Sequence, residues 1–128
     1  MILFFDAVSS LPEISLIEDN KIIYSKKIIN NFHDKLSDCL ISDYLDLKNN
    51  VLLNKKLKLL IVNTGPGSYT ALRVSIAFLS GLSISQKIEL KGVSCIELFS
   101  YSLKDHEQNS TALYIQSSNN QKFICFYD

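Results

Sequence analysis

Residues 65–85 read GPGSYTALRVSIAFLSGLSIS, a glycine-proline turn followed by a helix-length segment that carries a single charged residue, Arg73. The run before it, LKLLIVNT at residues 57–64, is continuous and apolar, as expected of a strand buried in a sheet. A buried strand that turns sharply at glycine and continues into a helix is typical of α/β proteins. This stretch therefore predicts an α/β fold.

The flanking sequence extends the same pattern. Strands are predicted at residues 2–7, 13–19, 21–28, 57–64, 88–94, 111–116 and 122–127, and helices at 34–47, 69–85 and 95–103. The order β-β-β-α-β-α-β-α-β-β, with a mixed sheet, predicts a half-domain of the ribonuclease-H-like, actin-kinase (ASKHA) type. We expect residues 1–110 to form an N-terminal domain of this type. Residues 111–128 are expected to begin a truncated second half-domain or to form a terminal hairpin.

The composition excludes several classes of function. Thirteen basic and thirteen acidic residues give a formal net charge of zero, which argues against direct binding of nucleic acid. The clustered lysines, Lys55, Lys56 and Lys58 together with Lys26 and Lys27, are interpreted as a solvated rim in preference to a binding surface. The two histidines, His33 and His106, lie too far apart to suggest a metal site. The sequence shows neither a signal peptide nor a membrane span, so we expect a cytoplasmic protein.

The glycine turn is a candidate site for an anion, because a helix N-terminus presents free amide groups. Its candidate residues for a nucleotide are Asp6, Gly65, Gly67 and Ser68, with Ser68 predicted as the N-cap of the helix. The turn matches neither the P-loop pattern, since no lysine follows Gly67, nor G-x-G-x-x-G. The structural interpretation, a close turn between strand and helix, is therefore preferred. We assign no catalytic residue and no metal ligand.

The helix after the turn is apolar around its whole circumference, whereas a helix lying on a sheet needs only one apolar face. Ala77 and Gly81 add small side chains that would let another helix approach closely. Either the first helix covers the remaining face, or both helices pack against another subunit. For the second case, the predicted interface residues are Leu36, Leu40, Tyr44, Arg73, Ala77, Gly81 and Ile84.

The segment at residues 65–75 resembles the signature G-P-G-S-[FY]-T-G-[LV]-R-[IV]-G of the TsaB family. The resemblance extends to the opening strands at residues 2–22, to His33, and to LKGVSCIELFSYSL at residues 90–103. It implies a non-catalytic role in making N6-threonylcarbamoyladenosine in tRNA. The implied partner is a TsaD-like transferase, joined by a TsaE-like ATPase, or a second copy of the chain. No cofactor is expected on this chain alone, and ATP or ADP belongs at a complex interface.

The sequence also departs from the family pattern. Asp6-Ala7-Val8 stands where the family has Asp-Thr-Ser, so a hydroxyl of a phosphate-binding turn is absent. Ala71 and Ser75 replace glycines of the signature. The family continues into a second half-domain, and we expect this chain to be a short form that lacks most of it. Two alternatives stay open: an ATP-binding enzyme of the actin-kinase superfamily that uses the Gly65–Ser68 turn, and a self-associating remnant without a transferase partner.

Overall fold

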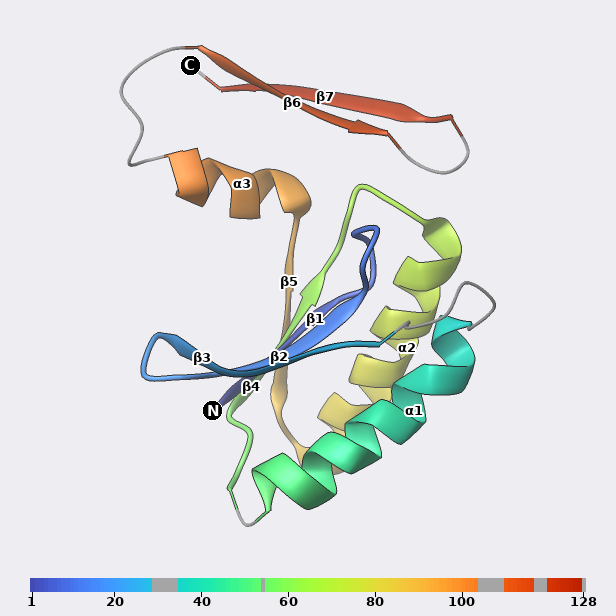
Figure 1. Cartoon of the computed structure of the whole chain (residues 1–128), viewed down its shortest axis with the longest axis vertical. Coiled ribbons are helices and arrows are strands. Elements are labelled where there is room, and N and C mark those ends of the chain that lie inside the picture. The colour runs from blue at the N-terminus through green and yellow to red at the C-terminus, as the bar shows by residue number, and fades with distance from the viewer. Residues whose placement is uncertain (29–34, 54, 104–109, 117–119, 128) are drawn as a thin grey trace.

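The computed structural model describes residues 1–28, 35–53, 55–103, 110–116 and 120–127. Its main sheet has the strand order β3-β2-β1-β4-β5 (Figure 1). The five strands are β1 (Ile2–Asp6), β2 (Glu13–Glu18), β3 (Lys21–Lys27), β4 (Leu59–Asn63) and β5 (Glu89–Val93). The first three form an antiparallel meander, and β4 lies parallel to both β1 and β5. The predicted mixed sheet and the predicted order of elements are confirmed.

Two helices, α1 (Leu36–Leu47) and α2 (Tyr69–Gln86), pack on one face of this sheet (Figure 1). Alternate side chains of the strands point toward them because the side-chain period of a strand is two residues. The buried set on this face includes Leu3, Phe5, Ile14, Leu16, Leu60 and Val62. On the opposite face, Phe4 and Ile61 are only half-buried. The apolar run at residues 2–7 suggests a strand buried on both faces, and the structure buries β1 fully on one face only.

The first helix continues further than predicted. Its predicted start at residues 33–34 lies outside the described residues. At its end, α1 passes directly into a π-helical turn, η1 (Lys48–Leu52). The segment NNVLLNKK at residues 49–56 suggests a polar connection, and that expectation is wrong, because the wider turn places Leu52 in the core at 4% exposure. Leu53 then leaves the helix with a φ of 45°.

After β5 the chain forms α3 (Cys95–Leu103) and a separate two-stranded sheet of β6 (Thr111–Gln116) and β7 (Lys122–Tyr127). All three elements have their predicted bounds. The predicted division into two domains after residue 110 stays a prediction. No helix among the described residues has the length and hydropathy needed to cross a bilayer.

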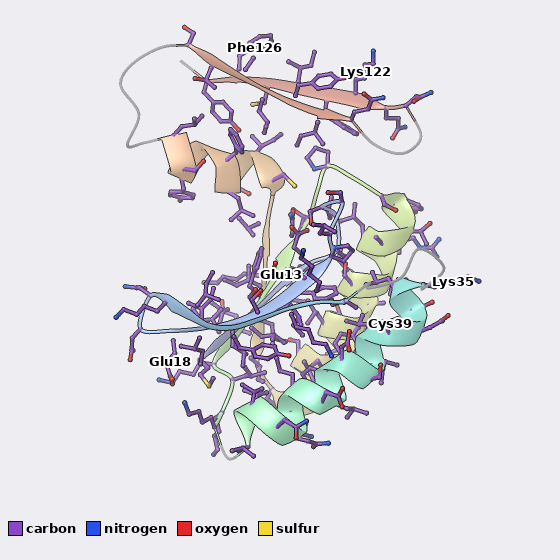
Figure 2. All side chains as sticks on the ribbon, in the orientation of Figure 1. Glu13, Glu18, Lys35, Cys39, Lys122 and Phe126 are labelled. Carbon is purple, nitrogen blue, oxygen red and sulfur yellow. The ribbon has the colours of Figure 1, made fainter. Side chains whose placement is uncertain are left out.

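The β6–β7 hairpin has two different faces. Toward the body of the molecule, the Tyr127 hydroxyl donates a hydrogen bond to the Ile96 carbonyl of α3 at 2.7 Å. The other face is apolar and open to solvent, with Tyr114 50%, Ile124 58% and Phe126 75% exposed. Figure 2 shows Phe126 on this outward side. The hairpin therefore exposes large side chains that strands of a folded domain usually cover.

One ion pair joins the edge of the sheet to α1. The Lys26 ammonium of β3 lies 2.7 Å from Oδ1 of Asp43, which is 8% exposed, and 3.8 Å from Oδ2 of the exposed Asp46. The second oxygen of Asp43, Oδ2, has no hydrogen-bond partner among the described residues. Hydrogen bonding to Asp43 raises the pKa of Lys26 above its ordinary 10.5. The stabilisation is therefore complete at neutral pH and is lost only as the pH rises through that raised value.

Replacing Lys26 by methionine should lower the free energy of unfolding by about 1–3 kcal/mol, because it leaves a buried carboxylate without a partner. The measurement is urea unfolding at pH 7. The double variant Lys26→Met/Asp43→Leu should regain most of the loss, since an apolar pair of similar volume replaces a buried ion pair at little cost. An unchanged urea midpoint for Lys26→Met would contradict the assignment of this pair as stabilising.

Candidate functional site

The glycine turn lies where β4 ends, at the carboxyl edge of the parallel strands. Gly65 has a φ of 94°, which side-chain-bearing residues rarely adopt, and its N–H donates to Oδ1 of Asn63 at 3.0 Å. The peptide bond between Gly65 and Pro66 is cis. Ser68 is the N-cap of α2, and its hydroxyl accepts from the Ala71 N–H at 3.4 Å. The predicted cap is confirmed.

Gly67 is required by its surroundings and not by its backbone conformation. Its backbone does not require glycine, since its φ is not positive, but its surroundings leave no room for a side chain. A Cβ at this position would lie 1.9 Å from Cγ1 of Val8 and 3.2 Å from the Val8 carbonyl oxygen. The turn therefore packs directly against the chain that follows β1. A valine methyl group occupies the space beside Gly67.

Asp6 ends β1 and faces the same edge, where its carboxylate organises the local backbone. Its Oδ1 accepts from the N–H groups of Val8 and Ser9 at 2.9 and 3.1 Å. The amide of Asn63 also donates to it, at 3.2 Å. These bonds hold the β1 turn against β4, and that is a structural role.

Cys95 completes this cluster from the start of α3. Its Sγ lies 3.2 Å from Nδ2 and 3.3 Å from Oδ1 of Asn63, and Asn63 is 2% exposed. Burial raises the pKa of the Cys95 thiol, which disfavours the reactive thiolate. Among the described residues, no three histidine, cysteine, aspartate or glutamate side chains gather as a metal ion would require. Asp6, Asn63 and Cys95 thus form a closed hydrogen-bonded cluster.

Two features of this edge are those of a close structural turn. Phosphate sites need backbone groups that a ligand can approach closely, and the space beside Gly67 is filled by Val8. The Asp6 carboxylate is engaged by groups of its own chain. The structure brings the predicted nucleotide residues Asp6, Gly65, Gly67 and Ser68 to one edge of the sheet, and the arrangement there fits a close structural turn better than a nucleotide site.

The segment GVSCIE at residues 92–97 caps α3. The Ser94 N–H and hydroxyl both donate to Oε2 of Glu97, at 2.7 and 2.8 Å, and the Glu97 N–H donates back to the Ser94 hydroxyl. This reciprocal pattern is a capping box. Hydrogen bonds from Ser94 lower the pKa of Glu97, so the cap is charged at neutral pH.

The α2 part of the predicted interface is exposed. Arg73, Ala77, Gly81 and Ile84 lie on one side of α2, and Ile84 is 80% exposed. A Cβ added at Gly81 would meet nothing within 4 Å. Residues three, four and seven positions apart share a helix face. These four positions therefore follow one exposed strip along the helix.

The predicted interface residues on α1 are not exposed but buried. Leu36, Leu40 and Tyr44 are 8%, 1% and 5% exposed, so they belong to the core of the chain itself. The ring of Tyr44 packs edge-on against Phe78 of α2, with centroids 5.4 Å apart. These three residues form the stripe that α1 turns toward the sheet and α2, and the prediction took this core stripe for an external surface.

Sequence reasoning missed four exposed residues beside this strip. They are Ile41 and Leu45 of α1, 56% and 47% exposed, and Tyr69 and Ile76 of α2, 70% and 39% exposed. Ile41 and Leu45 are four residues apart and so share one face of α1, and Ile41 lies one turn before Tyr44. The sequence does carry one signal for the residues on α1, because Ile41 and Leu45 form a second apolar pair outside the main apolar stripe of that helix. We call the set Ile41, Leu45, Tyr69, Arg73, Ile76, Ala77, Gly81 and Ile84 the α1/α2 outer surface.

The α1/α2 outer surface contains one charged side chain, and that charge is associated with an aromatic ring. The Arg73 guanidinium carbon lies 5.5 Å from the centroid of the Tyr69 ring. Beside it, Thr70, Arg73, Val74 and Ala77 line a shallow hollow of about 320 Å³. An exposed strip of this kind, mostly apolar with small residues at its centre, is typical of a site that packs against a helix of another protein.

The chain is similar to known proteins in both sequence and fold. A protein-family model described as TsaD, tRNA N6-adenosine threonylcarbamoyltransferase, matches residues 39–127. The tRNA threonylcarbamoyladenosine biosynthesis protein TsaB of Buchnera aphidicola subsp. Schizaphis graminum is 31% identical over 81 residues, which cover 59% of this chain and 39% of that protein.

Two solved structures share the fold. YeaZ from Pseudomonas aeruginosa superposes with a TM-score of 0.72 at 16% identity, over 98% of this chain and 59% of its own. A second structure, described as similar to peptidase YeaZ from the same organism, gives 0.69 at 18% identity, over 98% and 58%. The chain thus spans less than two thirds of the length of these relatives. The likeness confirms the predicted ASKHA-type fold.

The family model covers more than half of the chain, and it includes the signature turn, α2 and α3. The chain therefore belongs to the family that this model describes and, within it, to the TsaB type.

Proposed function

We propose that the chain is a non-catalytic, cytoplasmic partner of a TsaD-type transferase in the formation of N6-threonylcarbamoyladenosine in tRNA. The Buchnera relative carries the name of this pathway. The observation that carries the proposal is the α1/α2 outer surface, where large apolar side chains are exposed beside Ala77 and Gly81. Burying one side chain the size of Ile84 is worth about 1.5–3 kcal/mol, so this surface favours association strongly.

The geometry of the glycine turn supports a scaffold rather than an enzyme. Val8 fills the space beside Gly67, and Asp6 is bonded to its own backbone. The Cys95 thiol has a raised pKa, which makes it a poor nucleophile. The partner would then supply the catalytic groups and the nucleotide, and this chain would supply a rigid helical face.

The test is size-exclusion chromatography with light scattering, using this chain with and without a TsaD-type protein from the same genome. We expect a stable complex of the two proteins, which a TsaE-type ATPase then joins. A homodimer of the chain that does not dissociate when the TsaD-type protein is added would favour the self-associating alternative. Two separate monomers at high concentration would refute the proposal.

Calorimetry separates the scaffold from the enzyme alternative. Titration of the isolated chain with ATP and Mg²⁺ should give no heat of binding. Micromolar affinity would favour an ATP-handling member of the actin-kinase superfamily. The Gly65–Ser68 turn would then have to open by moving Val8, so a Val8→Ala variant with tighter binding would point to the same alternative.

A further inference from the structure

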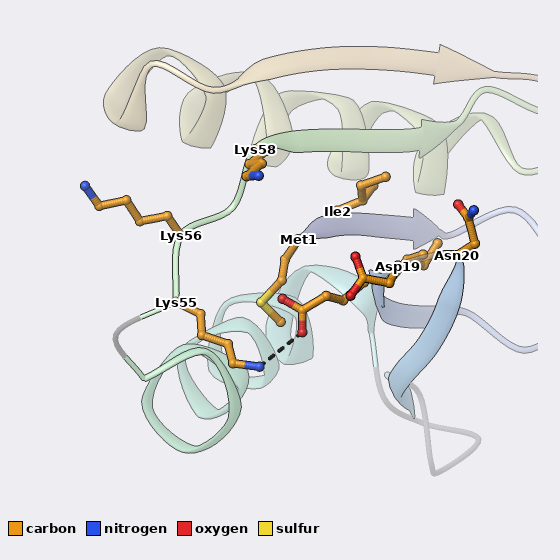
Figure 3. Close-up of a pocket in the computed structure, with 9 residues that line it drawn as sticks. Met1, Ile2, Asp19, Asn20, Lys55, Lys56 and Lys58 are labelled. Carbon is orange, nitrogen blue, oxygen red and sulfur yellow. Dashed lines mark hydrogen bonds and ion pairs between the residues drawn. The ribbon is translucent and has the colours of Figure 1, made fainter.

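A lysine-rich loop lies at the end of the sheet opposite the glycine turn. Lys55, Lys56 and Lys58 precede β4, and the Lys58 N–H donates to the Met1 carbonyl at the start of β1. All three lysines are exposed. Together with the β2–β3 turn at residues 18–20 they line a hollow of about 610 Å³ (Figure 3). We call Lys48, Lys55, Lys56 and Lys58 the lysine edge.

Most of the positive charge at this edge is unpaired. Lys55 lies 3.1 Å from the Glu18 carboxylate, and Asp19 is the other acidic residue that lines the hollow. Lys56 and Lys58 form no ion pair with any other described residue. Figure 3 shows Lys56 extending from the loop away from the Lys55–Glu18 pair. Two cations are therefore left facing solvent.

A second hollow, of about 330 Å³, adjoins the first. It shares Lys55 and Lys56 with the first and adds Lys48 from η1. Across both hollows, four lysines stand against two carboxylates. The zero net charge of the whole chain thus hides a local excess of positive charge, and it is the local field that attracts an anion.

The shape of this edge selects among anionic ligands. Both hollows are open to solvent, and Lys55 and Lys56 line both of them. Two neighbouring hollows joined by lysines match a ligand whose negative charges repeat along a chain. Exposed lysine ammonium groups that contact phosphates, without base-specific partners, are typical of sequence-independent binding to a nucleic acid backbone.

We propose that the lysine edge binds the phosphate backbone of RNA. The choice of RNA rests on the proposed function, because the pathway acts on tRNA. Lys56 and Lys58 lie outside the α1/α2 outer surface, so a transferase on that surface leaves them free. The chain would then hold the transferase through the α1/α2 outer surface and tRNA through the end of the sheet where β4 begins.

The test uses fluorescence anisotropy of labelled tRNA with the chain alone, as a function of salt. The wild-type chain should bind tRNA at low ionic strength, and its affinity should fall steeply with salt. Lys56→Glu/Lys58→Glu should weaken binding at least tenfold and reduce the slope of log K against log salt by about 1.4–1.8, since each lost phosphate contact removes about 0.7–0.9. The control is Lys91→Glu/Lys122→Glu, which makes the same change in net charge on β5 and β7.

Each outcome is decisive. Loss confined to the Lys56/Lys58 variant supports the proposal, and equal loss in the control would overturn it by showing an effect of net charge alone. No binding of tRNA at low salt, or equal binding of poly-glutamate, would also overturn it. The assay needs no transferase, so its failure leaves the complex with the TsaD-type protein untouched, and the failure of that complex would not alter the anisotropy result.

Discussion

Replacing Gly67 by alanine should lower the free energy of unfolding by about 1–3 kcal/mol, the usual cost of forcing an extra carbon into a packed site. The added Cβ would lie 1.9 Å from Cγ1 of Val8, far inside van der Waals contact. Valine is stiff at χ1, so its methyl group cannot simply turn away. The turn and the segment after β1 would have to separate. Urea unfolding of the purified variant measures the effect.

Two further variants make this test specific. Gly81→Ala is the matched control, because an added Cβ there meets nothing within 4 Å, and it should raise stability by about 0.5–1 kcal/mol. Val8→Ala combined with Gly67→Ala should regain part of the lost stability, because the colliding methyl group is gone. Additive effects of the two substitutions would show that Val8 and Gly67 do not meet in the folded protein.

Arginine at the centre of the α1/α2 outer surface should abolish association with the transferase partner. Ala77→Arg or Gly81→Arg places a long charged side chain where a helix must approach closely, and we expect the affinity to fall by about 100-fold or more. Both positions are exposed, so the variants should fold. Calorimetry or chromatography with the TsaD-type protein gives the affinity.

The control for the arginine variants is Ser102→Arg, an exposed position on α3 whose substitution should leave association unchanged. Thermal unfolding of each variant checks the fold. A variant at residue 77 or 81 that unfolds would contradict the structure, since it would make this face part of the core. Normal association of both folded variants would instead exclude the α1/α2 outer surface as the interface.

The fold could be predicted because strong periodic signals agree with the tertiary packing. The strands around Leu3 and Leu60 are short apolar runs of strand length, and the turn chemistry at Gly65 marks the passage from β4 to α2. The extension of α1 was missed because Asn49 and Asn50 resemble a loop. A π-helical turn has no strong local signal, and it forms here because it buries Leu52.

The candidate site could be predicted only in part. An apolar stripe on a helix has the same spacing whether it faces a core or a partner, so the sequence could not separate Leu40, which is buried, from Ile41, which is exposed. The role of Gly67 depends on a residue 59 positions away, Val8, and no local pattern carries such information. The exposed positions Ala77 and Gly81 were predicted because small residues four apart are themselves a helix-contact signal.

The β6–β7 hairpin should influence how much of this protein accumulates in a cell. Each of its strands pairs with the other alone among the described residues, so each offers an outer edge on which a foreign strand can add. Exposed edges beside Ile124 and Phe126 are the features that draw chaperones, proteases and aggregation partners. A partner that covers this hairpin should therefore lengthen the lifetime of the chain, and the abundance of the chain should follow that of the partner.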